Sequence, residues 1–393
     1  MACLIKAPQG EHKGVVTFTT AERDNLILPF KDLQLAADKL RQRFAVGIHH
    51  NWHDFNFRYN PLFDFHLAGE EDLIPVDGKP VPLIPMDACN FSPPCFAPAQ
   101  TEKFWDILFV ARAIKFKGIP EFFEAIRRLY NNGHELRVLF LCPMPPPGSA
   151  GAQSNIRELY DTRFEGIERQ RFTFLTMDFN YPFPLDLETL GHFYRSSRIF
   201  VHSAPDERRC RVAAYAWATG LPVVGKDCIG SVLSKPARKP PYFFEIDNYA
   251  EFPNAILDAL EASRNVPDFS TARREVASDL AIHTFDQYLR DLFEQRGWKP
   301  PVGKTASANL DLRMGRHHGL SFGANRIPQD IGRFMEALMS LSDGDYKDIM
   351  DLPDPENALA ARFPAQPRRN STEPGLKSRA VSFIRKRLST TRQ

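Results

Sequence analysis

Between Trp105 and Trp298, short apolar runs alternate with stretches whose apolar residues recur at helical spacing. This alternation predicts a series of strands and helices. Strands are expected at 106–111, 136–142, 172–177, 199–201, 221–224 and 242–246, and helices at 119–133, 186–197, 208–219, 249–263 and 283–298. Continuous apolar strands that alternate with helices are typical of a parallel sheet covered on both faces. The pattern therefore predicts an α/β fold.

The two ends of the chain are less regular. The first 100 residues predict a helix at 32–44, strands at 45–50 and 81–85, and a proline-rich hinge at 90–100. Beyond Trp298 only one helix is expected, at 328–342, and the chain from Asp351 is rich in Pro, Ser and Arg, which is typical of disorder. We therefore divide the chain into residues 1–100, 101–300 and a C-terminal extension at 301–393.

Composition narrows the function classes. The 393 residues are 43% hydrophobic and 25% charged, with a formal net charge of +2, so no polyelectrolyte partner such as nucleic acid is implied. The six cysteines form no CxxC pair and have no zinc-site spacing, which indicates reduced thiols in a cytoplasmic protein. No apolar run approaches the roughly 20 residues of a membrane span, and the N-terminus lacks a signal-peptide core.

Charged side chains gather at one predicted strand end. Asp206, Glu207, Arg208 and Arg209 follow the apolar strand 199–201. Ligands of parallel α/β sheets bind outside the carboxyl ends of the strands. This turn is therefore a candidate functional edge.

Five segments, in order along the chain, resemble the glycosyl transferases group 1 (family 4) enzymes of GT-B type. They are "LIPMDACNFSPPCF", "DILFVARAIKFKGIPEFFEAI", "DLETLGHFYRSSRIFVHSAPDE", "YAWATGLPVVG" and "CIGS", in a region that runs from about Ile84 to Trp298. The resemblance implies two Rossmann-like domains and a retaining transfer of sugar from a nucleotide-sugar donor, UDP- or GDP-linked, without cofactor or metal. The acceptor is left open as a glycan, a glycolipid or a protein.

The resemblance assigns roles to several residues. Arg112 and Lys117 match the family's phosphate-binding Arg and Lys, and a solvated basic loop is the alternative. Glu207 matches the first Glu of the E-x7-E motif, which contacts the donor sugar and makes it the candidate catalytic residue; a helix-capping carboxylate is the alternative. Ser203 is expected near the donor phosphates or as a turn residue, and Gly230 lies where the family has a glycine pair.

The sequence also departs from the family pattern. Tyr215 replaces the second Glu of E-x7-E, which binds the ribose, and Tyr can donate only one hydrogen bond there. Arg208 and Arg209 replace glycines whose N–H groups approach the diphosphate, so guanidinium groups are expected to supply the charge. The family's GxGP segment is replaced by "CPMPPPG".

The N-terminal region is short for an acceptor domain, so either it is reduced or the C-terminal extension helps to build it. The segment "GIHHNWHDF" contains His49, His50 and His53, which are weak candidates for the acceptor side; packed or surface histidines are the favoured alternative.

Two functions remain open: a retaining glycosyltransferase, and a catalytically silent relative that binds a sugar, a nucleotide or a partner on the same scaffold. The tail adds a second question, because residues 376–388 place apolar and basic side chains on separate helical faces. Such a helix can lie on an anionic bilayer, here the inner face of a membrane, and the alternative is a solvated, disordered tail.

Overall fold

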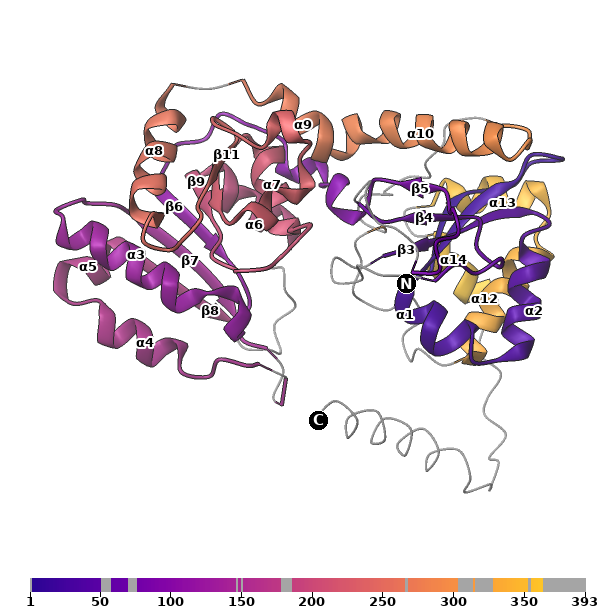
Figure 1. Ribbon diagram of the computed structural model, residues 1–393, viewed down its shortest axis with the longest axis horizontal. Coiled ribbons are helices and arrows are strands. Elements are labelled where there is room, and N and C mark those ends of the chain that lie inside the picture. The colour runs from indigo at the N-terminus through magenta and orange to yellow at the C-terminus, as the bar shows by residue number, and fades with distance from the viewer. Residues whose placement is uncertain are drawn as a thin grey trace.

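The computed structural model describes residues 2–50, 58–69, 76–145, 148–149, 151–177, 186–265, 268–302, 314, 328–352 and 355–362. Within this part of the chain, two α/β lobes lie side by side (Figure 1). The N-terminal lobe holds one sheet and the central lobe holds another. Helix α10 (Ser278–Gln295) leaves the central lobe and extends along the N-terminal lobe.

The central lobe is built on a six-stranded parallel sheet with the order β11-β10-β9-β6-β7-β8. Its strands are β6 (Trp105–Val110), β7 (Val138–Pro143), β8 (Phe172–Met177), β9 (Ser197–Val201), β10 (Val223–Gly225) and β11 (Phe243–Glu245). The expected strand bounds are confirmed to within two residues. The apolar runs predicted these strands because each strand is buried on both faces of the sheet. Two separate clusters of buried side chains cover those faces.

Helices cover this sheet on both faces. Those predicted are α3 (Ile119–Asn131), α6 (Leu187–Arg195), α7 (Arg211–Thr219) and α8 (Phe252–Arg264), together with α10. Three more were not expected: α4 (Ile156–Arg163), α5 (Gly166–Arg171) and α9 (Ser270–Val276). They are short, and few of their side chains are buried, so their apolar periodicity is weak.

The N-terminal lobe has a five-stranded sheet in the order β1-β2-β3-β4-β5. Its strands are β1 (Cys3–Lys6), β2 (Gly14–Thr19), β3 (Phe44–His49), β4 (Phe65–Leu67) and β5 (Leu83–Ile84), all parallel except β1. Helix α1 (Thr20–Glu22), a π-helical turn (Arg23–Ile27) and α2 (Lys31–Leu40) follow β2. The two expected strands correspond to β3 and β5, and the expected α/β class with two Rossmann-like units is confirmed.

The C-terminal extension completes the N-terminal lobe. Helices α12 (Pro328–Ser340), α13 (Asp343–Met350) and α14 (Pro355–Arg362) pack with α2 and the strands in one apolar cluster. The prediction of disorder from Asp351 is therefore wrong for α14, which spans Pro355–Arg362. Leu359 is fully buried in that cluster, and the Glu356 carboxylate accepts the N–H of Leu4 at 2.8 Å. Of the two alternatives for the short N-terminal region, the structure supports the second.

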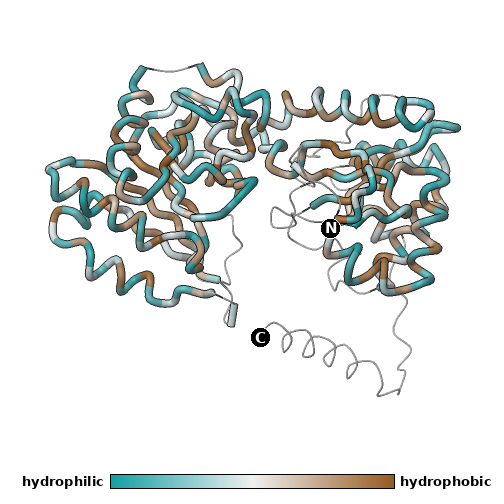
Figure 2. Tube along the Cα trace, viewed as in Figure 1, coloured by the Kyte–Doolittle hydropathy of each residue, from teal (hydrophilic) through white to brown (hydrophobic). Residues whose placement is uncertain are grey.

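Helix α10 joins the two lobes through its apolar face. Polar and apolar residues alternate along it (Figure 2), and Phe285, Leu289 and Phe293 are buried against strands of the N-terminal sheet. A second connection is the linker from β5 to β6, which includes two 3₁₀ turns, Ala88–Asn90 and Pro94–Phe96. Two connections therefore cross between the lobes, α10 and this linker.

The sequence also made predictions about the tail helix, His53, membrane spans and the cysteines. Residues 376–388 and His53 lie outside the described residues. Among the described helices, none combines the length and hydropathy needed to span a bilayer. All six cysteines are free thiols.

Candidate functional site

Two loops of the central lobe meet at the carboxyl edge of its sheet. Strands β6 and β9 are parallel neighbours, with Leu108 opposite Phe200. The chain after β6 reaches Lys117 through a 3₁₀ turn, and the chain after β9 forms the turn 202–210. Because parallel strands end at the same edge, residues 90 positions apart come into contact there.

The Glu207 carboxylate is held by two side chains. Its Oε1 atom accepts from Lys117 Nζ at 2.5 Å, and its Oε2 atom lies 2.5 Å from Nε2 of His202. The Lys117 and Glu207 side chains are only 12% and 11% exposed, and His202 is fully buried. The backbone N–H of Glu207 donates to the Cys228 sulfur at 3.3 Å. Of the expected donor residues, the structure thus brings Lys117 and Glu207 together.

The charges of this cluster follow from its surroundings. Burial alone would raise the pKa of Glu207, but His202 and Lys117 lower it to about 2. Burial lowers the pKa of His202, and the neighbouring carboxylate offsets part of that effect. A neutral imidazole beside an ionised carboxylate carries its proton on Nε2, so the buried Nδ1, which has no hydrogen-bond partner among the described residues, is unprotonated. The cluster is therefore one anion, one cation and one neutral ring.

Ser203 and Gly118 fix the distance between the two loops. The fully buried Ser203 hydroxyl donates to the carbonyl of Lys117 at 2.9 Å, and the Ser203 carbonyl accepts from the Tyr249 hydroxyl at 2.8 Å. Gly118 has φ +64°, and a Cβ at that position would lie 2.1 Å from the Ser203 carbonyl oxygen. The Ser203 hydroxyl is thus used to hold Lys117 in place.

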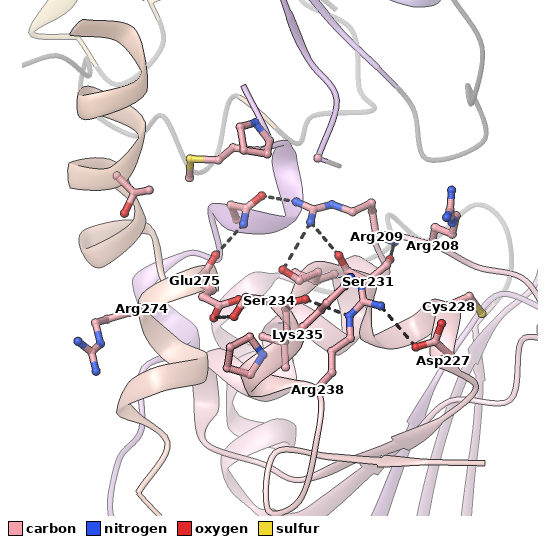
Figure 3. Close-up of a pocket in the computed structure, with 18 of the residues that line it drawn as sticks. Arg208, Arg209, Asp227, Cys228, Ser231, Ser234, Lys235, Arg238, Arg274 and Glu275 are labelled. Atoms are coloured by element: carbon pink, nitrogen blue, oxygen red, sulfur yellow. Dashed lines mark hydrogen bonds and ion pairs between the residues drawn. The ribbon is translucent and has the colours of Figure 1, made fainter. Parts of the chain in front are cut away.

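A pocket of about 780 Å³ lies beside this cluster (Figure 3). Cys228, which accepts the Glu207 N–H, is part of its wall, whereas Lys117 and Glu207 are not. Five cationic side chains and two carboxylates line it: Arg208, Arg209, Lys235, Arg238, Arg274, Asp227 and Glu275. The positive excess suits an anionic ligand.

The three arginines that were expected to bind the donor phosphates, Arg112, Arg208 and Arg209, differ in exposure and in their partners. Arg112 is exposed, and its side chain has no partner in the described ranges. Arg208 is half-buried and lines the pocket. Arg209 is 6% exposed, and its guanidinium is paired with Asp87, 122 residues earlier in the chain. Arg209 thus faces a carboxylate of its own chain.

Tyr215 and Gly230 make packing contacts. The Tyr215 ring is 8% exposed and stacks on Phe96, with centroids 4.0 Å apart and an interplanar angle of 10°. Its hydroxyl is hydrogen-bonded to Arg211. Gly230 is buried, and a Cβ there would lie 2.9 Å from the Phe243 ring. Neither residue is brought to the Lys117–Glu207 cluster by a described contact.

Two of the predicted histidines, His49 and His50, lie at the carboxyl end of strand β3 in the N-terminal lobe. His49 ends β3 and is within 3.4 Å of the Ala88 N–H in the linker. The His50 and His66 rings are buried and joined through Nε2 and Nδ1, 2.6 Å apart. Burial lowers the pKa of His49 to about 4 and that of His66 to about 2. His50 is thus a packed histidine, the alternative that the sequence favoured for this segment.

We expect the protein to lose stability as the pH falls below 6.5. The folded pKa values of His66 and His202 lie below the unfolded value of 6.5, so their stabilising effect is complete above pH 6.5 and lost below it. The His66 ring should cost about 1.4 kcal/mol between pH 7.5 and 5.5, and His202 adds a loss in the same direction. Urea unfolding at both pH values tests this. His66→Gln should reduce the pH dependence, and the exposed His192→Gln should not; equal slopes would contradict the assignment.

The cluster also contains a metal-compatible donor set. Ligand atoms of His202, Glu207 and Cys210, all buried, lie within 4.8 Å of one another. Imidazole, carboxylate and thiolate are zinc ligands. However, the Lys117 ammonium already contacts the same carboxylate, so a divalent cation would have to displace it or tolerate it. The residues present therefore fit an ion pair better than a metal.

Three residues of this site were not found by sequence reasoning. His202 directly follows an apolar strand and lies five residues before Glu207. A polar residue at that position could have indicated it. Gly118 adjoins the predicted Lys117, and its signal was a glycine at a strand-to-helix turn. Asp87 has no local signal, because its partner lies in the other lobe.

Comparisons with known proteins give similarity to solved structures only. No family model and no curated protein matches the sequence. The C-terminal domain of a glycosyl transferase group 1 family protein from Francisella tularensis is 17% identical, with 49% of this chain and 96% of that chain covered and a TM-score of 0.37. Sucrose-phosphate synthase from Thermosynechococcus elongatus is 19% identical, with 67% of this chain and 72% of that chain covered and a TM-score of 0.45.

A third structure is the pneumococcal O-GlcNAc transferase in complex with UDP and GlcNAc. It is 10% identical over 68% of this chain and 56% of that chain, with a TM-score of 0.43. The solved structures to which this chain is similar include glycosyltransferases. The roles of individual residues depend on this chain's own contacts.

Proposed function

We propose that this protein is a retaining glycosyltransferase that moves a sugar from a nucleoside-diphosphate sugar to an acceptor. The observation that carries the proposal is the contact between Lys117 and Glu207 at the carboxyl edge of the six-stranded parallel sheet. Ligands of open α/β sheets bind at this edge. A cation and a carboxylate fixed there supply one group for a phosphate and one for sugar hydroxyls.

The roles follow from charge and exposure. Lys117 has three ammonium donors, so it can keep its bond to Glu207 and still donate to a phosphate oxygen. Arg112 is exposed near it and can add a second charge-assisted contact. These side chains would stabilise the leaving diphosphate without a metal ion. The ionised Glu207 carboxylate would accept hydrogen bonds from the donor sugar.

A thermal-shift panel tests this proposal with UDP, GDP, ADP and CMP and with their sugar conjugates. One base should stabilise the protein, and its sugar conjugate should stabilise it further. Ligand binding at 100 times its Kd adds about 2.7 kcal/mol, which gives a readable shift. No stabilisation by any member of the panel would contradict the proposal.

The alternative is a silent binding protein on the same scaffold, and one observation favours it. Tyr215 takes the place of a second carboxylate and is stacked into the core on Phe96. A protein of this kind would bind a nucleotide sugar without hydrolysing or transferring it. Incubation with the stabilising conjugate, followed by mass spectrometry of the nucleotide, separates the two functions.

We expect Arg112→Ala to weaken nucleoside-diphosphate binding by about ten-fold or more, because a charge-assisted phosphate contact contributes roughly 1.5–3 kcal/mol. Isothermal titration calorimetry measures the change. Lys115→Ala is the matched control, since Lys115 is an exposed cation of the same loop. Equal losses in both variants would show that only the general charge of the loop matters, and an unchanged affinity for Arg112→Ala would remove its role.

A further inference from the structure

A buried ion pair joins the linker between the lobes to the turn that carries Glu207. Arg209 Nε donates to Asp87 Oδ2 at 2.9 Å, and Arg209 Nη2 donates to Oδ1 at 3.0 Å. The two side chains are 4% and 7% exposed. A planar guanidinium facing both carboxylate oxygens is a two-point contact that fixes direction as well as distance.

Every donor of this guanidinium is used. Besides the two bonds to Asp87, Nη2 donates to the Asn90 side chain, and Nη1 donates to the carbonyls of Ser231 at 3.1 Å and Val232 at 3.4 Å (Figure 3). A guanidinium has five N–H donors in a fixed fork. No donor is left for a phosphate, so the contact is built to hold protein segments together.

The backbones on both sides are tied as well. The Arg209 N–H donates to Ser231 Oγ at 2.7 Å, and the Cys89 thiol donates to the Arg209 carbonyl at 2.7 Å. Asp87 Oδ1 accepts the Cys89 N–H at 2.7 Å. Arg209 adopts φ +50°, the only positive value among the non-glycine residues described. A strained arginine persists where its surroundings hold it.

The N-terminal lobe packs directly on this pair. Gly69, two residues after β4, has φ +70°, and a Cβ there would lie 2.5 Å from Arg209 Nε and 2.9 Å from Asp87 Oδ2. The pair therefore contacts a strand end of one lobe, the linker, and a functional turn of the other lobe. Removing either charge would leave the other buried without its partner.

We propose that Arg209 is a positioning residue, whose ion pair with Asp87 latches the linker to the 202–210 turn and so holds Glu207 against Lys117 and His202. Glu207 is two residues before Arg209, in the same buried turn. Release of the latch frees both ends together, the linker around Asp87 and the turn around Glu207.

Hydrogen exchange on the full-length protein tests the latch without any ligand. In Asp87→Asn and in Arg209→Lys, peptides covering 85–92 and 203–210 should both exchange at least ten-fold faster, while β7 keeps its wild-type rate. The double variant should exchange little faster than either single one, because both changes remove the same contact. Arg238→Lys is the control, since Arg238 pairs with Asp227 at 3.4 Å in the wall of the same pocket. Wild-type exchange at 203–210 in a folded Asp87→Asn protein overturns the proposal.

Two further readouts complete the test. If neither variant folds, the wild-type protein in low urea should open at 85–92 and 203–210 with the same rate, and rates that differ ten-fold or more overturn the latch. A kinetic arm rests on the proposed function: kcat should fall at least ten-fold in Arg209→Lys, with nucleoside-diphosphate affinity unchanged. Faster exchange without any transferase activity in the wild type supports the latch and contradicts only the proposed function. A loss of affinity with kcat unchanged overturns the positioning role.

Discussion

Glu207→Gln should reduce sugar transfer by about 10²–10³-fold, the cost of removing one preorganised electrostatic contact to a transition state. The carboxylate is ionised at any working pH, since its pKa is lowered to about 2. Glutamine keeps the shape and one acceptor but removes the charge. Nucleoside-diphosphate affinity should stay close to the wild-type value, because the lost group faces the sugar and Lys117 remains to bind phosphate.

The measurement is kcat together with calorimetric binding of the nucleoside diphosphate. Asp206→Asn is the matched control, because Asp206 is the adjacent carboxylate and is exposed. Unfolding should be followed as well, since Lys117 is left as a buried cation whose ion pair has been removed. Undiminished turnover in Glu207→Gln would end the catalytic role, and loss of nucleotide binding with the fold intact would move Glu207 to the phosphate side.

Much of the central lobe could be predicted because its strands are buried on both faces. "DILFVA" and "FTFLTM" are continuous apolar runs, and β6 and β8 lie where those runs predict them. The N-terminal lobe was harder, since β4 and β5 have only three and two residues. Its cover also comes from the other end of the chain: Leu359 and Leu4 belong to one cluster, and no local pattern joins them.

The candidate site also contains residues that the sequence could predict and one whose role it could not. Lys117 and Glu207 were predicted from the family resemblance, and each lies in a loop that follows an apolar parallel strand, so both loops reach the same sheet edge. The role of Arg209 could not be predicted, since a guanidinium is equally suited to a phosphate and to a carboxylate. Which of the two it meets depends on Asp87, whose position is set by how the lobes pack.

Gly118→Ala should destabilise the central lobe by about 2–5 kcal/mol and disrupt the site at the same time. The added methyl would lie 2.1 Å from the Ser203 carbonyl oxygen, and that backbone is itself held by the Tyr249 hydroxyl. Overpacking of this kind costs roughly 1–3 kcal/mol, and a left-handed backbone adds about 1–2 kcal/mol for a residue with a Cβ. The Lys117 loop and the Glu207 turn must move apart to relieve the contact.

Gly133→Ala separates these two costs. Gly133 has φ +82°, and a Cβ there would meet no atom within 4 Å, so this variant carries the backbone cost alone. Urea unfolding should show a larger loss for Gly118→Ala, and calorimetry should show weaker nucleoside-diphosphate binding in Gly118→Ala only. If the two alanine variants were equally stable and bound equally well, the close approach of Gly118 to Ser203 would not be what holds Lys117 beside Glu207.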